Sequence, residues 1–121
     1  MVLMDPAGPS GLQPVSRFDW ERLIRRVRMH KTTKYVALGM ATYADADGSR
    51  VRPGVDELAL VLCISEPTVK RGYSVLRELG LIQKTKQGNR HAKEADTYRL
   101  TAPKNLTGLP ILGPDDHAKG A

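Results

Sequence analysis

Residues 65–79 carry two sets of side chains that alternate with the period of a helix. The apolar set, which the spacing predicts to face inward, is Val69, Tyr73, Leu76 and Leu79. The outward set is rich in basic and hydroxyl groups, which donate hydrogen bonds to anions. Its candidate binding residues are Thr68, Lys70, Arg71, Ser74 and Arg77, with Glu66 and Pro67 beside them in the first turn. A helix with one solvated face and no binding role is the alternative.

A second group of donors lies between residues 84 and 93, within a polar segment flanked by two strand-like stretches. Residues 81–86 and 97–100 are predicted to pair as a hairpin, because Gly88 and Asn89 between them favour a turn. The candidate binding residues of this hairpin are Lys84, Lys86, Asn89, Arg90, His91 and Lys93. The alternative is an exposed loop that binds nothing, and no residues near His91 complete a metal site.

The net charge places these donors in a basic molecule. The 121 residues include 19 basic and 13 acidic side chains, a net charge of +6. Residues 17–99 carry 17 basic and 10 acidic side chains, a net charge of +7, with basic concentrations in 17–34 and 81–99. A basic surplus favours a polyanionic partner, since Lys and Arg release counterions when they neutralise phosphates. Solvated faces without a partner are again the alternative.

Local signals indicate how the helix at 65–79 is positioned. Ser65 is a suitable N-cap, and Gly80 is placed to end the helix in the left-handed conformation. A shorter helix is predicted over residues 55–62, with acidic residues near its N-terminus. The turn between the two helices contains Cys63, where a positive φ would be strained for any residue except glycine.

The residues before position 55 predict two further helices. Ser16 and Asp19 have the spacing of a capping box, so a helix is expected from Ser16 towards Met29. Its apolar stripe is a possible dimerisation surface, formed by Trp20, Leu23, Ile24 and Val27. The stripe could instead pack on its own domain, and the helix's arginines allow an additional DNA contact. A second helix is expected over residues 33–44, followed by a turn at 45–48 and a short strand at 49–52.

Two segments carry a resemblance to a known family. Residues 56–71, DELALVLCISEPTVKR, resemble a bacterial helix-turn-helix, and residues 76–82, LRELGLI, look like the helix-to-wing junction of winged-helix regulators. The resemblance covers residues 31–101 and is closest to modules of bacterial transcription regulators and of plasmid or phage replication initiators. It implies an α+β winged helix-turn-helix, with a three-helix core and a β-hairpin wing. The helix over residues 15–30 would be an addition to this fold.

This resemblance implies that the helix after Ser65 lies in the major groove of double-stranded DNA. Arg71 would form a forked contact with guanine and Lys70 would contact a phosphate, while the wing follows the backbone or minor groove. We therefore expect a sequence-specific DNA-binding protein, acting as a transcriptional regulator and as a homodimer, with no enzymatic activity. The alternatives are a DNA-binding component of plasmid or phage replication, partition or excision, and a winged helix that contacts another protein.

The remaining segments set the expected boundaries. Residues 1–14 and 103–121 are expected to be a flexible leader and tail around the amphipathic helix (15–30) and the winged domain (31–102), although four apolar residues in the tail could dock. Because Cys63 is the only cysteine, an intramolecular disulfide and a multi-cysteine zinc site are excluded. No cofactor, metal or membrane contact is expected. The expected location is the cytoplasm.

Overall fold

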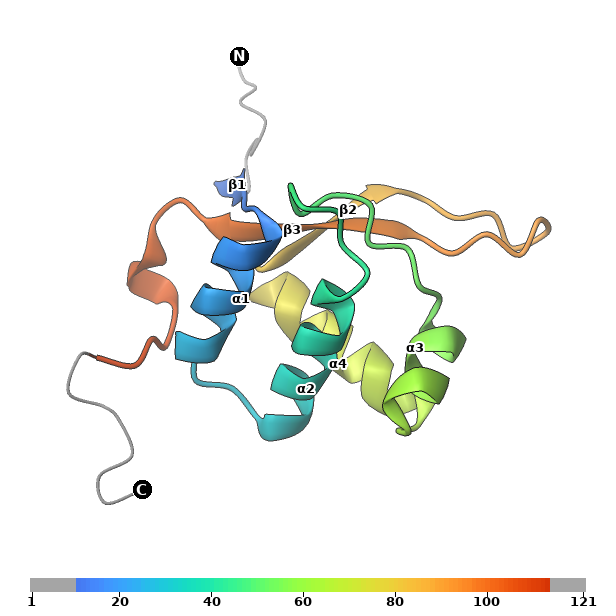
Figure 1. Cartoon of the computed structure of the whole chain (residues 1–121), viewed down its shortest axis with the longest axis horizontal. Coiled ribbons are helices and arrows are strands. Elements are labelled where there is room, and N and C mark those ends of the chain that lie inside the picture. Colours follow the sequence, from blue (N-terminus) through green and yellow to red (C-terminus); the bar gives the residue numbers. More distant parts are fainter. Residues whose placement is uncertain (1–10, 114–121) are drawn as a thin grey trace, which may run out of the picture.

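The computed structural model describes residues 11–113, which form an α+β arrangement of four α-helices and a three-stranded antiparallel sheet (Figure 1). In chain order the elements are β1 (Leu12–Pro14), α1 (Arg17–Arg26), α2 (Lys31–Ala41), α3 (Val55–Leu62), α4 (Glu66–Glu78), β2 (Ile82–Lys86), β3 (Thr97–Pro103) and a 3₁₀ helix (Leu106–Gly108). The helices lie together on one side of the sheet, and the β2–β3 hairpin projects past them. No helix in this range is long and apolar enough to cross a membrane.

The sheet joins both ends of the described chain. Its strand order is β1-β3-β2, with Leu12 opposite Pro103 and Ile82 opposite Leu100. The register of the β2–β3 pair shifts between Lys84 and Lys86. Residues 49–52 form no strand, contrary to expectation, but Val51 makes an isolated antiparallel bridge to Tyr98. The predicted hairpin is therefore confirmed, and β3 gains β1 and the Val51 bridge as further partners besides β2.

Helix α2 packs closely against both α3 and α4, and two glycines make this possible. A Cβ added to Gly39 would lie 2.9 Å from the Leu62 side chain of α3. A Cβ added to Gly72 of α4 would lie 3.0–3.1 Å from three side-chain atoms of Val36 in α2. A side chain at either glycine would therefore force the neighbouring helix, or its contacting side chain, to shift.

The apolar stripe of α1 was expected as a possible dimerisation surface, and the structure corrects this. Trp20, Ile24 and Val27 are fully buried in the core of their own chain, and Leu23 is half-buried against it. The indole N–H of Trp20 donates to the carbonyl oxygens of Leu81 at 2.8 Å and Thr101 at 3.0 Å. These side chains are already covered, so they leave no exposed apolar stripe for a second copy.

The expected flexible leader and tail also need correction where the structure describes them. Residues 12–14 are strand β1, because their backbone pairs with β3. Residues 106–112 lie against α1, where the Arg28 amide donates to the Pro110 carbonyl and the Leu112 amide to the Arg26 carbonyl. Leu109 is buried, as an apolar tail residue that docks should be. The rest of both predictions, residues 1–10 and 114–121, lies outside the described range.

Candidate nucleic-acid interface

Helices α3 and α4 meet at a turn whose geometry is fixed by backbone hydrogen bonds. Cys63 ends α3 in the left-handed conformation, with φ 61° and ψ 42°, which is the strained geometry that its position suggested. The Ile64 amide donates to the Ala59 carbonyl at 3.1 Å. The hydroxyl of Tyr35, from α2, donates to the Leu62 carbonyl at 2.9 Å. The last turn of α3 is thus bound to α2, and the direction in which α4 leaves the turn is defined.

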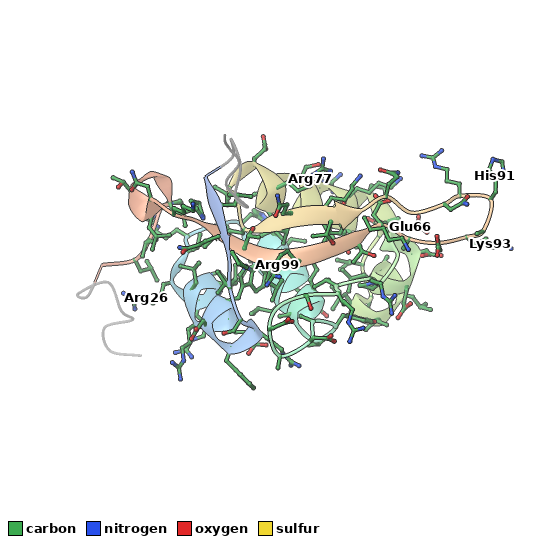
Figure 2. All side chains as sticks on the ribbon, turned by 90° about the horizontal axis from the view of Figure 1, so that it is seen from above. Arg26, Glu66, Arg77, His91, Lys93 and Arg99 are labelled. Carbon is green, nitrogen blue, oxygen red and sulfur yellow. The ribbon has the colours of Figure 1, made fainter. Side chains whose placement is uncertain are left out.

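Helix α4 presents its polar residues to solvent because its apolar side is buried. Val69, Tyr73 and Leu76 lie in the core, as the helical period predicted, while Leu79 is half-buried against it. Of the five candidate residues on this helix, four are exposed and Thr68 is half-buried; the exposed ones are Lys70, Arg71, Ser74 and Arg77. Figure 2 shows Arg77 on the outer side of α4, away from the core.

Thr68 connects the start of α4 to Arg71. The Ser65 hydroxyl caps the helix by accepting from the Thr68 amide, and it lies 2.7 Å from the Thr68 hydroxyl. The Arg71 guanidinium donates to that same hydroxyl at 3.2 Å. Since an arginine has five N–H donors, this contact orients the guanidinium and leaves most of its donors available. Thr68 therefore acts first as a positioning residue for Arg71.

The base of the β2–β3 hairpin is organised by Asp96. Its carboxylate accepts the Gly88 amide at 2.7 Å and lies 3.0 Å from Lys84 Nζ. The Gly88 hydrogen bond, followed by Lys84 and with a smaller effect of Arg77, holds the pKa of Asp96 below its ordinary value. Lys84 also donates to Gln87. Lys84, one of the candidate binding residues, therefore has two partners within its own hairpin.

The tip of the hairpin is shaped by Asn89. Its side-chain oxygen accepts the amides of His91 at 2.9 Å and Ala92 at 3.3 Å, and its carbonyl accepts the Glu94 amide. Lys93 adopts a positive φ of 56° in the same turn. The exposed cations are Lys86, Arg90 and Lys93, and within residues 11–113 their side chains form no ion pair. His91 and Lys93 lie at the far end of the hairpin (Figure 2).

Depressions border α4 on two sides, and their charges differ. The one towards the hairpin, of about 610 Å³, is lined by four carboxylates, from Asp56, Glu66, Glu94 and Asp96, and by two cations, from Arg90 and Lys93. The one towards the start of α2, of about 660 Å³, is lined by His30, Thr32 and Thr33 together with α4 residues that include Thr68 and Arg71. No carboxylate lines the second depression.

Sequence reasoning missed the second depression because it placed the start of α2 too late. The helix begins at Lys31, two residues before the predicted start. His30 is its N-cap, with the imidazole Nδ1 accepting the Thr32 amide at 3.1 Å. Histidine is not among the strongly preferred capping residues, so a helix that begins directly after His30 is difficult to predict.

No family model, curated protein or solved structure matches the chain. The donors on α4 and at the tip of the hairpin are exposed. The acids beside them include Glu66 in the first turn of α4, Glu94 in the hairpin loop and Asp96, which is engaged within the hairpin.

Proposed function

We propose that this protein binds double-stranded DNA in a sequence-specific manner, as a winged helix-turn-helix transcriptional regulator. In this assignment α3 and α4 are the helix-turn-helix, and the β2–β3 hairpin is the wing. The observation that carries the proposal is the outward face of α4, whose exposed Lys70, Arg71 and Ser74 are accompanied by a projecting hairpin with cations at its tip. Both features present donors to the same kind of polyanion.

The dimensions of a helix support this assignment. An α-helix with its side chains is about 10–12 Å across, which matches a major groove about 12 Å wide. Within the groove, a guanidinium can donate two parallel hydrogen bonds to guanine O6 and N7. Arg71 is the suitable residue, because Thr68 restricts its orientation before DNA arrives. Lys70 lacks such a fork and suits a phosphate.

The hairpin supplies the second contact. Two of its exposed cations, Arg90 and Lys93, lie in the turn beyond the Asp96 network at its base, and the third, Lys86, ends β2. Arg90 suits a narrow minor groove, where the negative potential is enhanced. Lys84 is not assigned to DNA, since its ammonium group is already paired. Asn89 holds the shape of the tip through its two accepted hydrogen bonds.

Selection of bound sequences from a random double-stranded DNA library tests the proposal. An enriched motif is expected, and a palindrome would support the further expectation of a homodimer. Clustered direct repeats would favour a replication or partition protein, and the absence of enrichment would contradict sequence-specific binding. A homodimer would have to form through a surface other than the apolar stripe of α1, since Trp20, Ile24 and Val27 are buried.

The selected site then tests the role of Arg71. Arg71→Ala should weaken binding by about 1–3 kcal/mol and relax the preference at one base position. Arg50→Ala is the matched control, because it removes the same charge from an exposed position outside α1, α4 and the hairpin. An equal loss on all DNA sequences would reassign Arg71 to a phosphate. A loss for Arg50→Ala as large as that for Arg71→Ala would contradict a particular role of α4 in DNA binding.

The salt dependence of binding tests the hairpin. Replacing Lys86 and Arg90 together by alanine should reduce the slope of log K against log salt by about 2, roughly one for each lost phosphate contact. The measurement is a series of titrations on the selected site at several salt concentrations. An unchanged slope would show that the hairpin lies outside the interface.

A further inference from the structure

The depression between the start of α2 and α4 collects hydrogen-bond donors without an opposing acid. Six of its lining residues are polar or basic: His30, Thr32, Thr33, Ser65, Thr68 and Arg71. Its volume is about 660 Å³, and no aspartate or glutamate is among its lining residues. This separates it from the depression on the hairpin side, which four carboxylates line. Carboxylates would repel an anion in the depression on the hairpin side, whereas the depression beside α2 has no carboxylate in its lining.

Thr33 places a hydroxyl in this depression that is not used inside the protein. Its side chain lines the depression and is only 8% exposed, and its hydroxyl has no hydrogen-bond partner within residues 11–113. The hydroxyl oxygen itself stays accessible, since among the described residues only the Tyr73 hydroxyl is both buried and unpartnered. The Thr33 hydroxyl can therefore donate to a ligand that has an oxygen acceptor.

The backbone at this end of α2 adds further donors. Within the described range the amides of Lys31 and Thr33 have no hydrogen-bond partner, and α2 directs its positive end into this region. His30 Nδ1 accepts the Thr32 amide, so Nε2 of the neutral ring carries the proton and is a donor. Arg71 supplies a full positive charge from α4. Amides, hydroxyls and a guanidinium together are typical of a site for a phosphate group.

The depression lies on the flank of α4 away from the hairpin. Thr68, Arg71 and Val75, spaced by three and four residues, line the depression near α2. Glu66 and Tyr73, seven residues apart, line the depression near the hairpin. At 3.6 residues per turn, Thr68 and Tyr73 are separated by about 140° around the helix. A phosphate in the α2 depression would therefore flank α4 on the side opposite the wing.

We infer that this depression binds one phosphate of the DNA backbone, through Thr33, the first amides of α2, His30 and Arg71. The inference rests on the proposed function and extends it. Helix α4 would enter the major groove with a phosphate anchor at α2 on one flank and the hairpin on the other. Arg71 belongs to the rim of this anchor and also to the reading face of α4.

The first test uses Thr33→Val, which removes the hydroxyl and nearly preserves the volume of the side chain. We expect a roughly three- to tenfold loss of affinity for the selected DNA site, in keeping with the net contribution of one ordinary hydrogen bond. Thr42→Val, at the opposite end of α2, is the matched control and should bind as the wild type does. Circular dichroism spectra and melting curves of both variants establish that they are folded.

The second test neutralises the ligand. DNA duplexes with a single methylphosphonate linkage, moved along the site, should identify a linkage at which wild-type binding falls. The Thr33→Val variant should be insensitive, or much less sensitive, to that same linkage. Equal sensitivity of the wild type and the variant at every linkage would overturn the inference, whereas failure of the wild type to bind any DNA would instead overturn the proposed function.

Inorganic phosphate distinguishes the DNA backbone from a free phosphate ligand. At constant ionic strength, a phosphate titration should shift the amide resonances of Lys31, Thr32 and Thr33 with saturation, and Thr33→Val should weaken this response. Saturable shifts without any linkage effect on DNA would retain the anion site but overturn its assignment to the DNA backbone. Shifts spread over the whole surface without saturation would overturn the anion site as well.

Discussion

Replacing Cys63 by glycine should stabilise the protein. Cys63 connects α3 to α4 with φ 61° and ψ 42°, the left-handed region that a Cβ disfavours. For a residue with a side chain this conformation costs roughly 1–2 kcal/mol. Glycine removes that strain but loses more backbone freedom on folding, an opposing effect of roughly 0.5–1 kcal/mol. Because Cys63 is exposed, its thiol contributes little burial, and the net gain is about 0.5–1 kcal/mol.

Urea unfolding measured by tryptophan fluorescence is the suitable assay, since Trp20 is the only tryptophan and is fully buried. The gain corresponds to a rise in melting temperature of roughly 2–8 °C for a domain of this size. Cys63→Ala is the matched control, because it removes the thiol but keeps the Cβ, and it should lie within about 0.5 kcal/mol of the wild type. If the glycine variant were no more stable than the alanine variant, the strain argument would be refuted.

Two further substitutions test the core and the hairpin. Trp20→Phe should cost about 2–4 kcal/mol in urea unfolding followed by circular dichroism, because it opens a small cavity and leaves the Thr101 carbonyl without its indole donor. A loss below about 1 kcal/mol, or an equal loss for Phe18→Ala at an exposed position, would contradict the burial of α1. Asp96→Asn should abolish an acid titration of the Gly88 amide resonance, which in the wild type follows the lowered pKa of Asp96 below 3.8. The ionised Asp96 carboxylate therefore stabilises the fold above its ordinary pKa, and this stabilisation is lost as the pH falls through the lowered pKa of the folded protein. A midpoint at or above pH 3.8 for the Gly88 amide resonance of the wild type would contradict this.

Elements specified by neighbouring residues could be predicted from the sequence. Helix α3 has the predicted bounds, Val55–Leu62, and the Ser65 hydroxyl caps α4 as expected. Gly80 has the predicted left-handed conformation, with φ 76°. Each of these features depends on residues within one or two helical turns. The signals are local, and so are the interactions that satisfy them.

The errors concern contacts between distant parts of the chain. The apolar stripe of α1 predicted burial correctly, but periodicity does not identify what covers a stripe. Here Trp20 contacts the sheet, because its indole donates to the carbonyls of Leu81, just before β2, and of Thr101 in β3. Val27 contacts the tail through its backbone bridge to Ile111. Strand β1 was missed because three residues carry no recognisable period, and its partner β3 lies about ninety positions later. The ion pair between Lys84 and Asp96 could not be predicted either, because it depends on the register of the hairpin.

Helix α2 links the two parts of the proposed DNA-binding surface. Its Val36 faces Gly72 of α4 at a separation that leaves no room for a methyl group without displacement. Val36 is fully buried and β-branched, so it has little freedom to move aside. The start of α2, with Thr33, and the exposed face of α4, with Arg71, are therefore held in a fixed relation. Such a relation favours α2 as the phosphate anchor, since a rigid support can set how α4 enters the groove before any base is contacted.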